Sequence, residues 1–511
     1  MWALGVPLLV LFLLTVAIWR RYFSPLSHIP GPFWASITRL WHAYHIFEGD
    51  HNTHIINLHE KHGHFVRIAP DEVSVSHPNG PKILLKTYLR KGDWYQAFTI
   101  PDYRYVTPQS TLDPKEKTER SRLFAPGFTL SHLLRSEPQY DANIALLFEW
   151  MDKHAEAHEP MHLDKFFTYT TFDNAGEAIF SKSLGFIKAG QDVSGSIANS
   201  RSLTRYMGIA GYYVWLLRLV VANPLITTLG LLPMGHLFRT SMEALHERKA
   251  NPDSRFDMVA HWLRAHQEYP DLLSYRDVEA MTTTTIAAGS DTLSCTPALA
   301  ASVVFGVSFA NEYVLGALQA FVYFMIRHQD AWHRAKGEVE ASMADGRCRG
   351  RVIAYDDARK LPFVKACIYE SLRMFGPGPF QLPRIAPKGG ITIGSRHFPA
   401  GTVLSINPQV MQQSKDCWGP DAKVFRPERW LPDGINTMYD YWLVFGLGYN
   451  RCPGEHLANI QLFKIAATIV RDYSIRQVDP EKEWEWKAYF TVVPHSWPVY
   501  ISKARLDKGV V

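Results

Sequence analysis

The sequence predicts a mainly α-helical protein with small β-sheets, preceded by one membrane-spanning helix. Apolar residues between positions 113 and 373 mostly recur at helical spacing, and a last helical pattern covers residues 455–473. Short strand-like runs occupy residues 66–68, 72–76 and parts of 386–410. Together these patterns favour a helical body that carries minor sheets.

Composition excludes several classes of protein. The chain has 511 residues, of which 47 % are hydrophobic and 20 % charged, so it is neither disordered nor collagenous and can bury a large core. Its net charge of +5 is too small for this length to indicate nucleic acid as a partner. The five cysteines form no C-x-x-C pair, which argues against a disulfide scaffold or a structural zinc site.

The N-terminus predicts a membrane anchor. Residues 2–19 carry no charge, and as a helix these 18 residues would reach about 27 Å, enough to cross a bilayer. Arg20 and Arg21 follow directly, which places the rest of the chain on the cytoplasmic side. A cleaved signal peptide fits less well, because the basic flank is at the wrong end and no small-x-small site follows. We expect an anchor over 1–21, a proline-rich hinge over 22–33 and a catalytic domain over 34–511.

A histidine-rich segment and several missing motifs narrow the chemistry. The histidines do not match the H-E-x-x-H zinc template, since Gly63 stands four positions after His59, so a solvated helix face is expected. No G-x-S-x-G elbow, Walker A loop or G-x-G-x-x-G turn is present, and the sequence gives no sign of direct nicotinamide binding. The histidines of the segment are His51, His54, His59, His62 and His64.

The sequence FGLGYNRCPG, residues 445–454, combines a cysteine with a glycine-rich turn before a helix. The helix N-terminus favours a thiolate at Cys452. Gly446, Gly448 and Gly454 let the backbone approach something flat and bulky. A buried free cysteine beside a turn is the simpler interpretation of any single cysteine. The complete ten-residue pattern is much rarer and favours a ligand site.

This segment, F-x-x-G-x-x-x-C-x-G, resembles the haem-binding loop of the cytochrome P450 monooxygenases. The resemblance implies a cytochrome P450 fold and haem b, with the thiolate of Cys452 as the axial ligand of the iron. It also implies that Phe445, at the start of the motif, contacts the cofactor. The nearest resemblance is to fungal microsomal members of the pisatin-demethylase-like and benzoate-hydroxylase-like types.

Two further motifs resemble the core of that family. Glu370 and Arg373 form an E-x-x-R pair on one helix face, which by itself is a weak signal because most such pairs are surface salt bridges. The segment FRPERW, residues 425–430, resembles the family's P-E-R-F/W motif. By this resemblance, Arg429 joins Glu370 and Arg373 in a buried structural triad beneath the haem.

A fourth motif, AGSDT at residues 288–292, resembles the A-G-x-D/E-T sequence of the family's long central helix. Ala288 and Gly289 have little bulk, so the resemblance implies that oxygen and substrate approach the iron there. It makes Asp291 and Thr292 the catalytic pair that delivers protons. A merely threonine-rich helix is the simpler alternative, given the threonines at 282–285.

The chain departs from the family where cations usually face the haem propionates. The register of the W/H-x-x-x-R motif gives Lys117 and Ser121, and Asn450 stands two residues before the cysteine. Arg384 does match the family's arginine after the E-x-x-R helix. Carboxylates favour paired cations, so neighbours should compensate. The expected compensating cations are Lys117, Arg120 and Arg122, of which Arg122 is included with Arg384 among the cofactor-binding residues.

Residues 295–315 form a 21-residue segment between the D-T-x-S sequence and a helix that the family joins directly to it. Pro297 would break or kink a continuous helix there. One interpretation is a real loop or extended helix, and the favoured one is a translated retained intron. A cloned transcript that joins Ser294 to Gly316 would establish the intron.

The resemblance implies an anchored haem-thiolate monooxygenase of the endoplasmic reticulum membrane. Electrons would come from NADPH through a separate reductase, with cytochrome b5 as a second candidate donor, and O2 would oxidise a small apolar organic substrate. The alternatives are a haem-thiolate isomerase or peroxygenase, or a non-catalytic membrane-tethered binding protein if the extra segment disrupts the central helix. The expected substrate-facing residues are 93–112, 203–233, the turn at Ala288, 380–382 and 489–493, which are rich in apolar and aromatic side chains.

Overall fold

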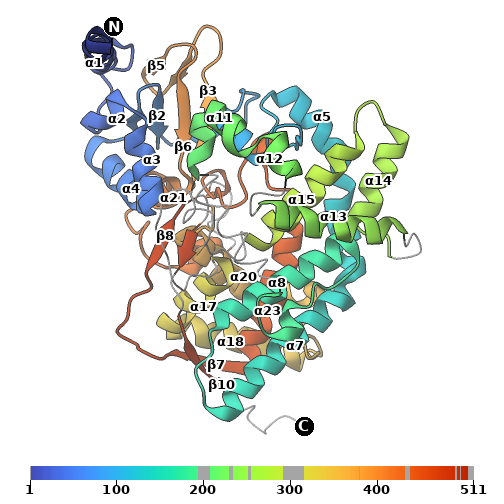
Figure 1. The fold of residues 1–511 in the computed structure, drawn as a ribbon. Helices are drawn as coiled ribbons and strands as arrows, with labels where there is room; N and C mark the ends of the chain where they lie inside the picture. Colours follow the sequence, from blue (N-terminus) through green and yellow to red (C-terminus); the bar gives the residue numbers. More distant parts are fainter. Residues whose placement is uncertain are drawn as a thin grey trace.

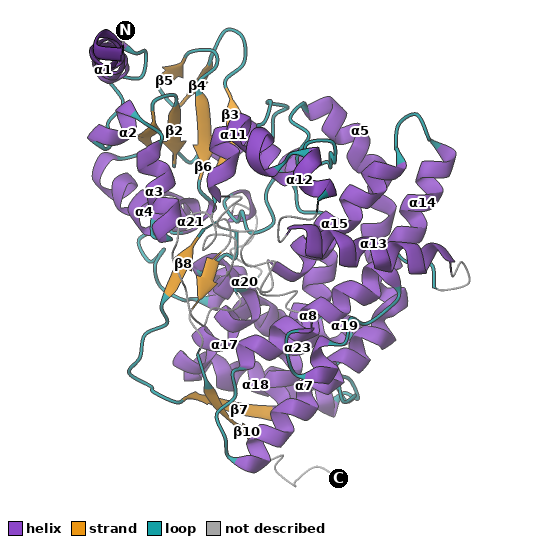
Figure 2. Ribbon diagram, in the orientation of Figure 1, coloured by secondary structure: helices purple, strands orange, loops and turns teal. Residues whose placement is uncertain are grey.

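A helical body that carries several small sheets makes up the fold (Figures 1 and 2). The computed structural model describes residues 2–99, 101–193, 208–229, 234–250, 255–291, 316–378, 380–431, 438–489, 492–494 and 497–504. The predicted fold class, mainly α with small sheets, is confirmed.

Helices account for most of the described chain. The longer ones are α1 (Trp2–Ile18), α3 (Leu40–Glu48), α4 (His51–His62), α5 (Pro114–Phe124), α7 (Glu137–Ala157), α8 (Leu163–Phe180), α13 (Met234–Ala250), α14 (Met258–Glu268), α15 (Tyr275–Asp291), α17 (Ala317–Arg327), α18 (Gln329–Ala344), α20 (Pro362–Met374) and α23 (Glu455–Asp472). The shorter ones are α2 (Phe33–Ile37), α6 (Leu130–Leu133), α9 (Phe186–Ala189), α11 (Val214–Leu216), α12 (Pro224–Thr228), α19 (Tyr355–Ala358), α21 (Pro408–Gln412) and α22 (Lys415–Trp418).

The main sheet has four strands in the order β1-β2-β6-β3. Its strands are β1 (Phe65–Ala69), β2 (Glu72–Val75), β3 (Leu382–Ile385) and β6 (Val403–Ile406). β1 and β2 form an antiparallel hairpin, and β2 runs parallel to β6 with Glu72 opposite Val403. Three two-stranded sheets pair β4 (Ile391–Ile393) with β5 (Arg396–Phe398), β7 (Tyr473–Gln477) with β10 (Val499–Lys503), and β8 (Trp486–Ala488) with β9 (Val492–Pro494).

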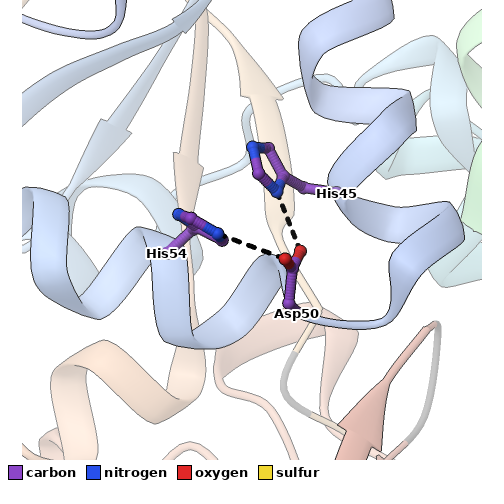
Figure 3. Close-up of side chains that lie close together, drawn as sticks. All are labelled: His45, Asp50 and His54. Atoms are coloured by element: carbon purple, nitrogen blue, oxygen red, sulfur yellow. Dashed lines mark hydrogen bonds and ion pairs between the residues drawn. The ribbon is translucent and has the colours of Figure 1, made fainter.

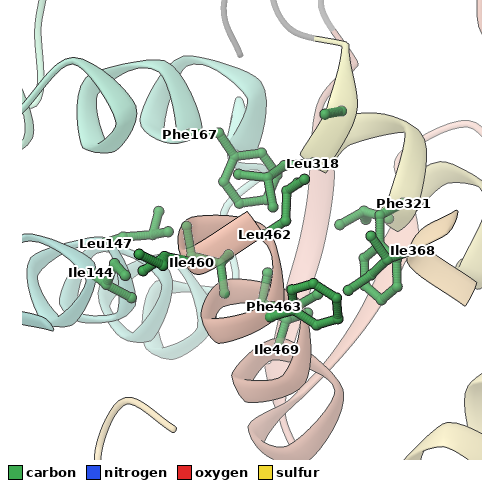
Figure 4. Close-up of a cluster of buried hydrophobic side chains, with 14 of the residues drawn as sticks. Ile144, Leu147, Phe167, Leu318, Phe321, Ile368, Ile460, Leu462, Phe463 and Ile469 are labelled. Carbon is green, nitrogen blue, oxygen red and sulfur yellow. The ribbon is translucent and has the colours of Figure 1, made fainter. Parts of the chain in front are cut away.

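The core is organised around α23. Apolar side chains project from several sides of this helix, and those at 460, 462, 463 and 469 meet residues of four other helices (Figure 4). Each fully buried aliphatic or aromatic side chain stabilises the fold by about 1.5–3 kcal/mol. The partners drawn are Ile144 and Leu147 of α7, Phe167 of α8, Leu318 and Phe321 of α17, and Ile368 of α20.

The N-terminal helix projects from the body at one edge of the molecule (Figure 1). Residues Gly5–Phe23 form one apolar helix long enough to cross a membrane, and the side chains of its apolar stretch are not buried by the rest of the chain. This is consistent with the predicted anchor, because a lipid-exposed helix can satisfy all of its backbone polar groups internally.

The histidine-rich helix α4 corrects one expectation. His51 and His59 are buried rather than solvated, because α3 and the β1–β2 hairpin cover one side of α4. The ring of His59 bonds to the carbonyl of Gly63 and the hydroxyl of Ser74, both at 2.8 Å. Nearby, the buried His45 and the partly exposed His54 share the carboxylate of Asp50 (Figure 3).

Candidate functional site

The loop before α23 is closed by its own backbone and requires glycine. The N–H of Cys452 donates to the carbonyl of Phe445 at 2.7 Å. Gly446 and Gly448 have φ angles of 70° and 65°, in the left-handed region that glycine adopts without strain. A Cβ at Gly448 would also lie 2.3 Å from the carbonyl oxygen of Leu85. The loop therefore holds Cys452 directly before the first turn of α23.

The environment of the Cys452 thiol suits a metal ligand better than a free thiolate. Cys452 is exposed as a residue, whereas Cys348 and Cys367 are buried and Cys417 is partly buried. Desolvation by the surrounding protein raises the thiol pKa to about 11, although the N–H groups of Gly454 and Glu455 lower it. The helix terminus thus favours the thiolate as expected, but desolvation outweighs it. A coordinated metal ion deprotonates a cysteine outright.

The structure brings Glu370, Arg373 and Arg429 together in the core. The Arg373 guanidinium donates two bonds of 2.8 Å to the Glu370 carboxylate, and Nε of Arg429 donates a third at 2.9 Å. Trp430 Nε1 donates to the same carboxylate at 2.9 Å. The side chains of all three charged residues are fully buried. These bonds join α20 to the turn η9 (Pro427–Trp430).

A chain of hydrogen bonds connects this ionic core to the cysteine loop. Arg373 Nη1 donates to the carbonyl of Gln412 at 2.6 Å, and the amide oxygen of Gln412 accepts from the N–H of Leu443 at 3.1 Å. The carbonyl of Leu443 in turn accepts from the N–H of Gly446 at 3.0 Å. The ionic core therefore positions the loop that carries Cys452.

Three cations gather near Tyr449 of the loop. Lys91 and Arg384 are almost fully buried, and Lys117 is partly buried. Lys91 Nζ donates to the carbonyls of Pro108 and Gln109, Lys117 Nζ donates to the carbonyl of Tyr449, and Arg384 donates to the hydroxyl of Tyr95. The rings of Tyr95 and Tyr449 lie within cation–π distance of this cation cluster, Lys91, Lys117 and Arg384.

The cation cluster fits an anionic ligand. In the described part of the chain, no ion pair joins any of its members to a carboxylate, and Arg384 Nε is buried without a hydrogen-bond partner. Burial and the charges of Arg384 and Lys117 lower the pKa of Lys91 well below its usual value. A ligand with two carboxylates would relieve this repulsion, and haem carries two propionates. The described residues therefore fit haem in two ways. The thiol of Cys452 can bind the iron, and the cation cluster can pair with the two propionates.

Of the three compensating cations expected to face the propionates, one lies in the cation cluster and two do not. Lys117 lies in the cluster, whereas Arg120 is already bonded to Glu116 at 3.0 Å and Asp277 at 2.9 Å. Arg122 is exposed and, five residues from Lys117, lies about 140° around α5. Among the described residues, no hydrogen bond or ion pair links Arg122 to the cluster.

Lys91 was missed in the sequence, where no motif marks it. It enters the cluster because residue 91 forms an antiparallel β-bridge with residue 384. This bridge joins a loop before α5 to strand β3, which are nearly 300 positions apart in sequence. Only the pairing of this loop with strand β3 could have indicated that Lys91 belongs to the cluster, and no local sequence pattern encodes that pairing.

The central-helix motif is only partly described. Ala288, Gly289 and Asp291 lie in α15, but their side-chain surroundings, Thr292 and residues 295–315 are outside the described residues. Earlier in α15, Thr282 and Thr283 bond to helix carbonyls at 2.7 and 3.0 Å. These two threonines are thus satisfied by their own helix.

Three of the expected substrate-facing segments meet in one apolar cluster. Trp94 stacks on Phe380 with ring centroids 4.5 Å apart, and Ile209 and Tyr212 pack against the same cluster. Its other members are Ile46, Tyr95, Ala97, Phe98 and Leu112. The last expected segment, 489–493, begins at Tyr489, which is also buried.

These features define a haem-thiolate oxidoreductase: a cysteine on a glycine loop before a central helix, a buried ionic core behind it, and an unpaired cation cluster. The family model for cytochrome P450 matches residues 30–300 and 315–498, with an interruption between positions 300 and 315. The chain belongs to the cytochrome P450 family. Haem b is therefore its cofactor, and a reductase partner supplies the electrons.

Curated relatives are fungal enzymes of similar length. The chain is 28 % identical over 94 % of both chains to cytochrome P450 monooxygenase gsfF of Penicillium aethiopicum. It is 25 % identical to pisatin demethylase of Fusarium vanettenii, covering 93 % of this chain and 89 % of the relative. Identity to cytochrome P450 monooxygenase cicH of Emericella nidulans is 26 %, over 97 % of both chains. The predicted resemblance to fungal members, including the pisatin-demethylase type, is confirmed.

Lys117 gives haem binding a predicted pH dependence. Burial, and then the charge of Arg384, lower the pKa of Lys117 to about 8. A haem carboxylate favours the protonated lysine, so above this pH the apoprotein must take up a proton to bind. We expect the affinity of the apoprotein for haem to fall as pH rises above about 8, by up to about tenfold per pH unit. Titration followed by the Soret absorbance measures this slope.

Matched variants of α5 test the role of Lys117. Lys117→Gln should lower the affinity at neutral pH and remove the slope, whereas Lys117→Arg should retain the affinity without the slope because arginine does not titrate there. Arg122→Gln removes an equal charge from an exposed site and should change neither property. The same slope in Lys117→Gln as in the native chain would contradict the assignment.

Proposed function

We propose that this protein inserts one oxygen atom from O2 into a small, mostly apolar organic substrate in fungal secondary metabolism. Hydroxylation, epoxidation and oxidative demethylation all belong to this reaction class. The observation that carries the proposal is that the loop of Cys452 is linked both to the ionic core, through Leu443, and to the cation cluster, through Tyr449. Relatives named as monooxygenases and as a demethylase support it.

The proposed roles follow from the positions of the residues. Cys452 would hold the haem iron through its thiolate, Phe445 would contact the haem at the start of the loop, and Arg384 would pair with a propionate. Lys91 and Lys117 would complete the propionate site. Bound haem supplies the activation of O2 by electrons that arrive singly. By resemblance to the family motif, Ala288 and Gly289 would leave space beside the haem, and Asp291 and Thr292 would move protons there.

The apolar cluster around Trp94 and Phe380 indicates the substrate class. Stacked aromatic rings favour an apolar or aromatic molecule and give few polar anchors for a charged one. Burial of such a molecule against these rings excludes water from the reacting carbon. We therefore propose an aromatic or terpenoid substrate.

The anchor and the partners complete the proposal. We place the protein in the endoplasmic reticulum membrane as a single-pass protein with its catalytic domain in the cytoplasm. NADPH–cytochrome P450 reductase is the proposed electron donor, and cytochrome b5 is a second one. The basic residues after the apolar helix support this orientation.

Three measurements on the full-length protein test this function. The reduced carbon-monoxide complex should show a thiolate-type Soret band, and turnover should depend on NADPH and reductase without added peroxide. Turnover only with peroxide would support a peroxygenase, and conversion without reductant an isomerase. Absence of haem uptake would support a binding protein. Comparison of the metabolites of a deletion strain with those of its parent would then identify the substrate.

A further inference from the structure

A small cavity lies where the membrane anchor meets the catalytic body. It has a volume of about 290 Å³ and is formed by the end of the apolar helix, the proline-rich hinge and strand β1. We call it the hinge cavity. Its lining residues are Arg21, Ser27, His28, Ile29, Pro30, Gly31, Pro32, Ser36, His62 and Arg67.

The hinge cavity is lined by two arginines and two histidines and by no acidic residue. These residues are Arg21, Arg67, His28 and His62. Arg67 is only 1 % exposed, yet its Nε and Nη1 atoms have no hydrogen-bond partner among the described residues, and neither has Nε of Arg21. A buried donor left without a partner costs about 1–3 kcal/mol, and more when it is charged. Three such donors at one cavity indicate a missing acceptor.

The position of Arg67 is fixed by its remaining nitrogen. Arg67 Nη2 donates to the carbonyl of Arg20 at 2.9 Å and to that of Pro70 at 2.7 Å. The N–H of Arg67 also donates to the carbonyl of Pro30 at 2.8 Å. The guanidinium is thus held in place by the carbonyls of Arg20 and Pro70 and the backbone by the hinge, while two nitrogens of the guanidinium have no partner among the described residues.

Nearby acids do not neutralise the cavity. Asp71 and Glu72 both form ion pairs with Arg39, which does not line it. Burial, and then the charge of Arg21, lower the pKa of Arg67 to about 10. The guanidinium groups of Arg21 and Arg67 repel each other, and an anion bound to both would relieve this repulsion.

Exposed aromatic side chains place the cavity at the level of lipid headgroups. Tyr22, Phe23 and Trp34 are each more than 60 % exposed, and Trp19 and Phe33 are about half exposed. Such residues concentrate at membrane–water interfaces, where the ring lies near the headgroups. Figure 1 shows α1 next to α2 and the β-strand region at one edge of the molecule. The basic cavity therefore lies on the same side as the phosphates of the leaflet.

We propose that the hinge cavity binds the phosphate of an anionic phospholipid, with Arg21 and Arg67 as its ligands. A guanidinium donates two parallel hydrogen bonds to phosphate oxygens, which matches the free nitrogens of Arg67. The bound lipid would fix the angle between the anchor and the catalytic body. His28 and His62 line the rim and supply further donors.

Calorimetric titration of the full-length holoprotein in neutral detergent micelles tests this proposal. The probes are dioctanoyl phosphatidic acid, dioctanoylglycerol, which has the same chains without the phosphate, and inorganic phosphate. Phosphatidic acid should bind and dioctanoylglycerol should not. Equal binding of inorganic phosphate would retain the anion site but overturn the assignment to a lipid. Absence of binding by both phosphate compounds would overturn the site.

Neighbouring arginines provide a matched control. Arg21→Gln and Arg67→Gln should each weaken phosphatidic acid binding about tenfold, the loss expected for one charge-assisted pair. Arg20→Gln removes the same charge one residue away but leaves the cavity intact, because Arg20 donates to the carbonyl of Ile37 and does not line it. If Arg67→Gln does not fold, Arg21→Gln decides, since its side chain makes no described hydrogen bond. Equal weakening by Arg20→Gln would overturn the proposal.

Discussion

Replacement of Cys452 by serine is expected to abolish the thiolate-type Soret band of the reduced carbon-monoxide complex and all NADPH-dependent oxidation. Serine preserves the size of the side chain and the N–H bond to Phe445, so the loop should keep its conformation. Its hydroxyl is a poor substitute for a thiolate that donates electron density to iron. Absorption spectra, turnover assays and far-UV circular dichroism of the same preparation separate loss of the ligand from loss of the fold.

Another free cysteine provides the control for this experiment. Cys417 is partly buried in α22, and it lies outside the glycine loop. Cys417→Ser should therefore retain both the thiolate-type band and turnover. Retention of the thiolate-type Soret band and of NADPH-dependent oxidation in Cys452→Ser would contradict the assignment of Cys452 as the haem ligand.

Local sequence patterns predicted the parts of the site that depend on local geometry. Glu370 and Arg373 are three residues apart on α20, so helical spacing alone places their charges together. Cys452 and its glycines are similarly encoded in ten consecutive residues. The strands at 65–69 and 72–75 also follow from a short alternating pattern around a turn.

Parts that depend on distant segments could not be predicted in this way. Lys91 has no motif and becomes a member of the cation cluster only through its bridge to Arg384. His51 and His59 are buried because other elements cover α4, which a polar composition does not reveal. The free nitrogens of Arg67 likewise arise where the hinge, the anchor and β1 meet. Whether a polar residue at such a position is buried, paired or without a partner depends on tertiary contacts, which a local sequence pattern does not encode.

The second large expected effect concerns the buried ionic core. Glu370→Gln should destabilise the protein by about 3–5 kcal/mol, because it leaves the buried guanidinium group of Arg373 without a countercharge and that of Arg429 with only the longer contact to Asp421, at 3.3 Å. Both arginines have fully buried side chains, so water cannot compensate for the lost charge. Urea unfolding followed by tryptophan fluorescence measures the change. Weaker haem retention should accompany it, since Arg373 holds the cysteine loop through Gln412 and Leu443.

Glu428→Gln is the matched control, because Glu428 lies one residue from Arg429 but pairs at the surface. Its carboxylate bonds to Arg334 at 2.8 Å, with both side chains about half exposed. Exposed pairs of this kind contribute about 0–1 kcal/mol, so the urea midpoint should barely move. Similar shifts for the two variants would mean that the Glu370 carboxylate is not the countercharge of the core. In that case the ionic core could not be what holds Cys452 in position, and the loop would have to be fixed by its own backbone bonds alone.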